Sequence, residues 1–160
     1  MKKLKFLKQF SFLMSIMMIF TVLTACGNTK GEMREMTTME IVQDMGLGIN
    51  LGNTFESQGN GNTVTSYETA WGSPVVTKEM IQGYADCGFG ALRVPVAWSN
   101  MMTGNYDISK EYLDRVTEVI DWALESGMYV IVNIHWDGGW FERFAVDEDK
   151  DECMYKYTRI

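Results

Sequence analysis

The sequence is poor in the residues that metal and redox sites need. It contains one histidine, three cysteines and two prolines among 160 residues. The cysteines, Cys26, Cys87 and Cys153, fit no C-x-x-C spacing, and one histidine leaves too few ligands for a zinc site. We therefore expect no metal. Cys87 is predicted to be a small buried residue at a helix end, and whether Cys87 and Cys153 form a disulfide stays open.

Basic residues are also scarce. Lysine and arginine number 14 against 21 aspartates and glutamates, a formal net charge of −7, and four of the lysines fall within the first eight residues. The rest of the chain is therefore more acidic still, so we expect no nucleic acid as a partner. The one acidic run, residues 147–152, is predicted to be a solvated loop or helix start, with calcium binding as the alternative.

No apolar run is long enough for a confident membrane span. An apolar stretch over residues 10–22 follows the four lysines and precedes Leu23-Thr-Ala-Cys26, an order typical of an export signal. The last four residues resemble the lipobox of bacterial lipoproteins. We therefore predict a lipoprotein signal peptide over residues 1–25, a lipidated Cys26 with a tether over residues 26–37, and export to the outer face of a bacterial membrane or cell surface. The alternative is an ordinary signal peptide with an incidental cysteine.

Three apolar segments end in polar residues. They are predicted strands over residues 47–53, 91–98 and 129–134, with corresponding ends at Asn53, Pro95 and His135, about 40 residues apart. A short amphipathic helix is predicted from Thr38 through Met45. Two further helices are predicted after Thr77 and Ser109, and Gly88 and Gly127 end them. Residues 56–76 are predicted to be a long loop. Alternating strands and helices favour a parallel sheet, although this pattern alone does not separate a barrel from a doubly wound sheet.

Four motifs, in a fixed order along the chain, are more specific than the alternation of strands and helices. They are Gly48-x-Asn-Leu-Gly-Asn-x-Phe-Glu56, Trp71-Gly-Ser-Pro74, Arg93-Val-Pro-Val-x-Trp98 and Asn133-Ile-His-Trp-Asp-Gly-Gly-Trp140. Together they resemble glycoside hydrolase family 5, and within it the bacterial endoglucanases. The resemblance implies a (β/α)8 barrel. Because such a barrel needs about 250 residues, residues 38–160 are expected to be its N-terminal part, about the first three β/α units of a truncated catalytic domain.

The resemblance also implies an activity. It is hydrolysis of O-glycosyl bonds by a retaining endo-β-1,4-glucanase without a cofactor, with cellulose or a related β-glucan as partner; xyloglucan, mannan or xylan stay open. One alternative is a non-catalytic carbohydrate-binding or inert surface lipoprotein, which this chain would be if Ile160 were the true C-terminus. A different barrel enzyme, such as an aldolase or a metal hydrolase, would need a lysine or further histidines at the strand ends.

Retaining hydrolysis needs two carboxyl groups about 5 Å apart. In the family these are glutamates at the ends of the fourth and seventh strands, the first preceded by asparagine. The sequence holds no Asn-Glu pair, so no catalytic acid, base or nucleophile is assigned. The resemblance gives supporting roles to Arg93, beside the nucleophile, and to His135, at sugar hydroxyls near it. From the residues alone, Arg93 in an apolar strand needs a carboxylate partner. The alternative for Arg93 is a structural ion pair of the barrel, and the alternative for His135 is a histidine packed in the core.

Sugar contacts are predicted at five further positions. The resemblance gives them to Asn53 and Glu56, for which a turn-forming asparagine and a surface carboxylate are the alternatives. Indole rings are usual platforms for pyranose rings. Trp71, Trp136 and Trp140, which lie near glycines, are the candidates, with core packing as the alternative, and packing is the prediction for Trp98.

Overall fold

The computed structural model describes residues 35–160, and residues 37–160 form one compact unit. The predicted signal peptide, Cys26 and most of the predicted tether lie outside the described residues. The elements, in chain order, are α2 (Thr38–Met45), β1 (Gly48–Asn50), α3 (Val64–Glu68), α4 (Lys78–Asp86), β2 (Ala91–Val96), η1 (Trp98–Met101), α5 (Lys110–Glu125), β3 (Tyr129–Ile134), η2 (Asp137–Ala145), η3 (Asp147–Asp149) and α6 (Lys150–Tyr157). Within residues 35–160, no helix has the length and apolar character to span a bilayer.

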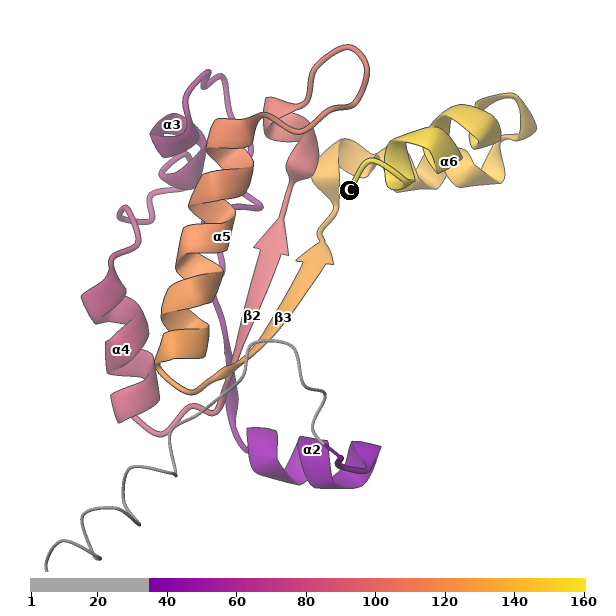
Figure 1. Ribbon diagram of the computed structural model, residues 1–160. Helices are drawn as coiled ribbons and strands as arrows, with labels where there is room; N and C mark the ends of the chain where they lie inside the picture. Colours follow the sequence, from indigo (N-terminus) through magenta and orange to yellow (C-terminus); the bar gives the residue numbers. More distant parts are fainter. Residues whose placement is uncertain (1–34) are drawn as a thin grey trace, which may run out of the picture. The chain divides into compact units, whose positions relative to one another are not determined.

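The three strands form the predicted parallel sheet, and their order is β1-β2-β3. Figure 1 shows β2 and β3 side by side. In its register Asn50, Arg93 and Ile131 stand side by side across the sheet. Because side chains alternate between the two faces of a strand, these three share one face. Because the three strands run parallel, their carboxyl ends meet at one edge of the sheet.

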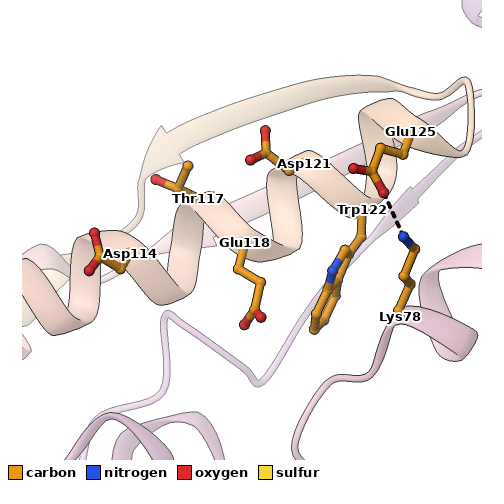
Figure 2. Close-up of a pocket in the computed structure, with 7 residues that line it drawn as sticks. All are labelled: Lys78, Asp114, Thr117, Glu118, Asp121, Trp122 and Glu125. Atoms are coloured by element: carbon orange, nitrogen blue, oxygen red, sulfur yellow. Dashed lines mark hydrogen bonds and ion pairs between the residues drawn. The ribbon is translucent and has the colours of Figure 1, made fainter.

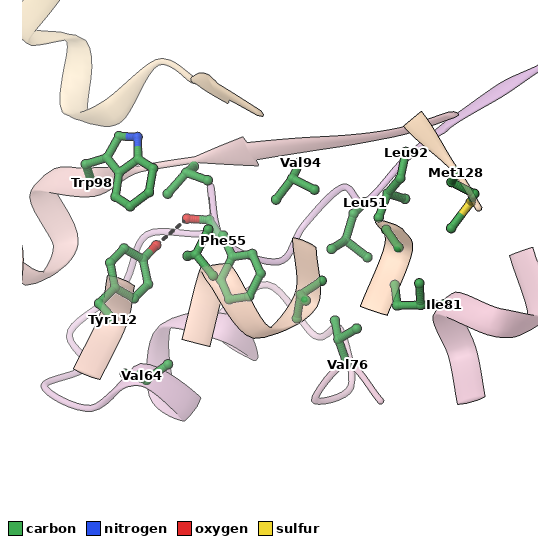
Figure 3. Close-up of a cluster of buried hydrophobic side chains, with 14 residues drawn as sticks. Leu51, Phe55, Val64, Val76, Ile81, Leu92, Val94, Trp98, Tyr112 and Met128 are labelled. Atoms are coloured by element: carbon green, nitrogen blue, oxygen red, sulfur yellow. Dashed lines mark hydrogen bonds between the residues drawn. The ribbon is translucent and has the colours of Figure 1, made fainter. Parts of the chain in front are cut away.

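The opposite face of the sheet carries the core. Leu92, Val94 and Val96 are fully buried there and pack with the inner faces of α4 and α5 (Figure 3). Tyr112 of α5 reaches across this core and donates a hydrogen bond to the carbonyl oxygen of Phe55 at 2.8 Å. Burial raises the pKa of its hydroxyl. The core thus holds the segment after β1 against the helices.

The predicted helix boundaries are confirmed at their caps. The Thr77 and Ser109 side chains accept backbone N–H groups at the starts of α4 and α5, and Gly88 and Gly127 follow these helices at φ 90° and 80°. Such positive φ values favour glycine because it lacks Cβ. The acidic run is an exposed helix start, as predicted.

Three predictions about local structure are wrong. The segment over residues 56–76 is not all loop, because Thr63 caps the short helix α3. Strand β1 spans only Gly48–Asn50, since the chain turns soon afterwards and Asn53 takes φ 58°. Cys87 lies at the end of α4 but is exposed, whereas Cys153 is buried in α6, and both are free thiols.

Candidate functional site

Three polar side chains come together towards the carboxyl edge of the sheet: Asn50 of β1, Arg93 of β2 and His135, the residue after β3. The Arg93 guanidinium donates from one nitrogen to Asn50 Oδ1 at 2.5 Å, and its other terminal nitrogen lies 3.3 Å from His135 Nδ1. His135 is held in place by its backbone N–H, which continues the sheet with a 3.1 Å hydrogen bond to the Val96 carbonyl. The sequence assigned Arg93 and His135 to one site, and the structure brings them together.

Arginine fixes the tautomer of its neighbour. A guanidinium has only donors, so His135 Nδ1 must accept, and the proton of a neutral imidazole then resides on Nε2. This leaves an N–H donor on the ring nitrogen that does not face Arg93. A donor at that place suits a hydroxyl oxygen of a sugar.

Among residues 35–160 the partners of Arg93 are an amide and an imidazole. The carboxylate partner predicted for Arg93 is the nucleophile, which is expected to lie outside this chain, so that contact stays a prediction. The register explains Asn50, which lies directly beside Arg93 on the same face of the sheet. Arg93 is half-buried, and no carboxylate of the described residues neutralises it.

The turn after β1 is built on Glu56. Its two carboxylate oxygens accept the backbone N–H groups of Asn53 at 2.6 Å and Thr54 at 3.0 Å. Glu56 is buried, so it is not the surface carboxylate offered as its alternative. Asn53 is exposed in a left-handed conformation at φ 58°. This conformation fits the alternative given for Asn53, a turn-forming asparagine. Sugar contacts by Asn53 and Glu56 stay predictions.

Two of the candidate platforms are exposed. Trp71 is 48% and Trp136 is 58% exposed. The indole N–H of Trp71 donates to the Gln58 carbonyl at 2.9 Å. A Cβ at Gly138 would lie 3.7 Å from the Gln58 side-chain amide, so the segments after β1 and β3 adjoin through Gln58. The two open indoles therefore belong to neighbouring loops.

Trp140, the third candidate platform, is buried. Only 7% of it is exposed, its indole N–H donates to Asp137 at 2.8 Å, and its ring stacks on Phe141. In this arrangement the ring has no open face for a pyranose, so its alternative as a packing residue fits better. Trp98 is buried against Tyr112, and its predicted packing role is confirmed.

Sequence reasoning missed three residues of this region. Asn50, Gln58 and Asp137 were not assigned, although Asn50 and Asp137 stand inside the quoted motifs. A polar residue within a short apolar strand was the available signal for Asn50. Nothing in the sequence places Gln58 beside Trp71, because 13 residues separate them.

A hollow lies on the outer, helical face. A groove of about 340 Å³ is lined by Lys78, Trp122 and carboxylates of α5, shown in Figure 2. Lys78, the lysine that lines it, is already paired with Glu125 at 2.6 Å. The groove is built from α4 and α5 and none of the strand-end residues, and it does not belong to the site.

Known proteins match this chain over most of its length. The model of the glycosyl hydrolase family 5 cellulases matches residues 55–159. A xyloglucan-specific endo-beta-1,4-glucanase of Bacteroides ovatus is 39% identical over 138 residues, 80% of this chain and 27% of that protein. Endoglucanase A of Paenibacillus barcinonensis is 36% identical over 140 residues, 84% of this chain and 34% of that protein.

Solved structures of family 5 enzymes also match this chain. A broad-specificity endoglucanase of Ruminococcus champanellensis with bound cellotriose has a TM-score of 0.73 at 31% identity, over 80% of this chain and 38% of that one. A family 5 enzyme of Prevotella bryantii in complex with a xyloglucan tetradecasaccharide has a TM-score of 0.67 at 33% identity, over 74% and 38%. These are (β/α)8 barrel enzymes, so the predicted fold, an incomplete barrel, is confirmed. The chain spans about a third or less of the two curated relatives named above.

Proposed function

Because the chain belongs to glycosyl hydrolase family 5, we propose that it forms the first β/α units of a retaining endo-β-1,4-glucanase. The observation that carries the proposal is the contact of Arg93 with Asn50 and His135 at the carboxyl edge of the sheet. That edge is where (β/α)8 barrels build their active sites. A half-buried guanidinium without a carboxylate partner among the described residues suits an anionic group delivered from elsewhere in the barrel.

The proposed mechanism assigns supporting roles to the described residues. A retaining hydrolase needs a carboxylate nucleophile and a carboxylic acid about 5 Å apart. The positive charge of Arg93 keeps such a nucleophile ionised by favouring its charged form. His135, with its proton on Nε2, donates to a sugar hydroxyl beside the scissile bond. In this proposal both carboxyl groups come from family positions outside residues 35–160.

The proposed substrate is a β-1,4-linked glucan, including xyloglucan. Two of the matched proteins are described with xyloglucan, and a third holds cellotriose. The exposed rings of Trp71 and Trp136 support this choice, because flat aromatic faces stack on pyranose rings. Stacking contacts the glucose rings of the glucan main chain rather than their side-chain sugars. It is therefore compatible with both branched and unbranched glucans.

The experiment is an assay of the protein expressed from its complete open reading frame. Release of reducing ends from xyloglucan, mixed-linkage β-glucan and carboxymethyl cellulose is measured, with mannan and xylan as comparison substrates. The proposal expects hydrolysis of at least one glucan, with the β-anomer released first, as retention requires. Binding without hydrolysis supports the non-catalytic carbohydrate-binding alternative. If the protein neither binds nor hydrolyses any of these polysaccharides, the alternative of an inert surface lipoprotein is supported.

We also propose that the protein is a lipoprotein anchored through Cys26 to the outer face of a bacterial membrane. The support is the order of lysines, apolar residues and Leu23-Thr-Ala-Cys26 in the sequence. Mass spectrometry of the protein from the native membrane fraction is expected to find a diacylglyceryl group on an amino-terminal Cys26. Replacement of Cys26 by Ser is expected to move the protein to the soluble fraction. An unmodified Cys26, or cleavage at another bond, contradicts the proposal.

A further inference from the structure

Asp137 has a buried carboxylate that the proposed mechanism does not use. The residue is 1% exposed. Its Oδ1 accepts the backbone N–H of Ser99 at 2.8 Å, and its Oδ2 accepts the indole N–H of Trp140 at 2.8 Å. Both oxygens therefore have donors within the protein, and the carboxylate is shielded from solvent. The carboxylate suits neither proton transfer nor substrate contact.

The hydrogen bonds of Asp137 join two strand ends. Ser99 lies in η1, directly after β2, whereas Asp137 begins η2 directly after the turn that follows β3. Arg93 is on β2, and His135 precedes Asp137 by two residues. The Ser99 bond thus fastens together the two segments that present Arg93 and His135.

The turn that Asp137 holds has an unusual backbone. Trp136, Asp137, Gly138 and Gly139 have φ of 36°, 52°, 76° and 74°. Two consecutive residues with side chains at positive φ are unfavourable, and such a conformation persists only where its surroundings impose it. The Gly139 N–H donates to the Trp136 carbonyl at 2.8 Å inside the turn. The Asp137 carboxylate ties this turn to Ser99 in η1 and to Trp140 further along η2. The Trp136 indole stays exposed.

Lys156 of α6 completes the surroundings. Its ammonium lies 4.6 Å from the centre of the Trp140 ring and donates to the Ser99 hydroxyl. Its partial burial lowers its pKa, which the negative charge of Asp137 opposes. Ser99 and Trp140, the two residues that bind Asp137, therefore both contact Lys156, whose ammonium also lies 5.6 Å from the centre of the Tyr106 ring.

We propose that Asp137 is a positioning residue of the glucan site. Through Ser99 and Trp140 it fixes the left-handed turn that presents Trp136 to the substrate and holds His135 against Arg93. This inference rests on the proposed function, because the sugar contacts of Trp136 and His135 belong to it. A displacement of about 1 Å in such a site can lower the rate about a hundredfold.

The test compares variants of the protein expressed from its complete open reading frame. Asp137→Asn keeps the size of the side chain but turns an amide N–H₂ group toward one of two donors, Ser99 N–H or Trp140 Nε1–H. Asp137→Ala removes both acceptors. Asp121→Asn is the matched control, because Asp121 is an exposed carboxylate on α5. KM and kcat on xyloglucan are measured together with hydrogen exchange of peptides covering residues 97–101 and 136–141.

Asp137→Asn is expected to raise KM about tenfold and to lower kcat about tenfold, the equivalent of a small displacement of the site. Exchange is expected to accelerate in both peptides and to stay unchanged in Asp121→Asn. A protein that merely loses stability has fewer folded molecules, which lowers apparent kcat and leaves KM unchanged.

A second substitution makes the test specific to the hydrogen bonds. Trp140→Phe removes the indole donor and keeps an aromatic ring. In the double variant with Asp137→Asn, the amide oxygen can face Ser99 without a donor opposite its N–H₂ group, so KM is expected to return toward the wild-type value. An unchanged KM in Asp137→Asn, or no recovery in the double variant, overturns the positioning role. If the wild-type protein hydrolyses no glucan, the proposed function fails, and the exchange rates alone decide whether Asp137 holds the turn.

Discussion

Glu68 and Arg115 form an ion pair that is largely buried. The side chain of Glu68 is 1% exposed, and its carboxylate accepts from Arg115 at 2.8 and 3.1 Å and from the Val76 N–H at 2.7 Å. Burial works to lower the pKa of Arg115, but hydrogen bonds with Glu68 and Glu118 outweigh it, and the pKa is raised. Arg115 also donates to the Val76 carbonyl at 2.6 Å. At the scale of single residues, this pair holds α3 and the following segment against α5.

Glu68→Gln is expected to lower the free energy of unfolding by about 3 kcal/mol, because it leaves Arg115 without its buried counter-charge. Glu118→Gln is the control, since Glu118 binds the same guanidinium from a half-exposed position and an exposed pair contributes less than about 1 kcal/mol. Urea denaturation of both variants measures the difference. Equal losses would show that the burial of Glu68 does not matter.

Arg93 makes contacts that suit chemistry better than stability. Its partners are Asn50 and His135, so its charge is not balanced by any carboxylate among the described residues. Arg93→Ala in the protein expressed from its complete open reading frame is expected to lower kcat on xyloglucan at least a hundredfold, because the nucleophile loses its stabilising charge. KM is expected to change little. Comparison with Arg115→Ala, which removes an arginine outside the site, separates catalysis from folding, and an unchanged kcat would contradict the role of Arg93.

Helices of this protein differ in what they bury. α5 buries Tyr112, Val116, Val119 and Ala123, whereas α2 buries none of its residues and leaves Met39 and Val42 exposed. Both begin at a side chain that caps backbone N–H groups, Ser109 for α5 and Thr37 for α2. At the scale of elements, the same kind of N-cap therefore begins both a helix that packs into the core, α5, and a helix that does not, α2.

Ser109→Ala is expected to lower the free energy of unfolding by about 1 kcal/mol, the usual contribution of an N-cap. Thr37→Ala is expected to leave the global unfolding transition in place, because α2 adds no buried side chain to the core. Hydrogen exchange is expected to speed up over residues 38–45 in Thr37→Ala, since a cap stabilises its own first turn. The prediction is wrong if the two variants shift the unfolding midpoint equally.

The sheet of the described unit has two open edges, β1 and β3. On β3 the apolar side chains of Ile131 and Val132 are 45% and 42% exposed, and as neighbours in a strand they point to opposite faces. A parallel sheet is normally covered on both faces. At the scale of the whole molecule, β3 therefore has the surface of a strand that further structure covers, as expected for part of a barrel.

A polypeptide of residues 35–160 expressed alone is expected to aggregate and to bind a hydrophobic dye, because exposed strand edges and apolar faces pair between copies. Replacing Ile131 and Val132 together by lysine is expected to reduce both effects. Val146→Lys is the control, because Val146 is as exposed as Val132 but lies outside the sheet. Sedimentation velocity and dye fluorescence measure the outcome. A monodisperse wild-type polypeptide without dye binding contradicts the expectation.

Local signals in the sequence determined much of this fold. Thr77, Ser109, Gly88 and Gly127 mark helix ends because capping and positive φ depend on a few adjacent residues. The apolar runs marked the strands, and the ordered motifs indicated the family. The same motifs placed Arg93 and His135 at one site, because parallel strands bring their carboxyl ends to one edge.

Only the tertiary structure decided which partners those side chains have. Asn50 lies beside Arg93 because of the register between strands 43 residues apart, which no spacing rule supplies. Trp136 and Trp140 have the same residue type and similar neighbours, yet one ring is exposed and the other is buried on Asp137. Burial depends on what packs against a residue from distant parts of the chain, and the sequence around a tryptophan does not record it.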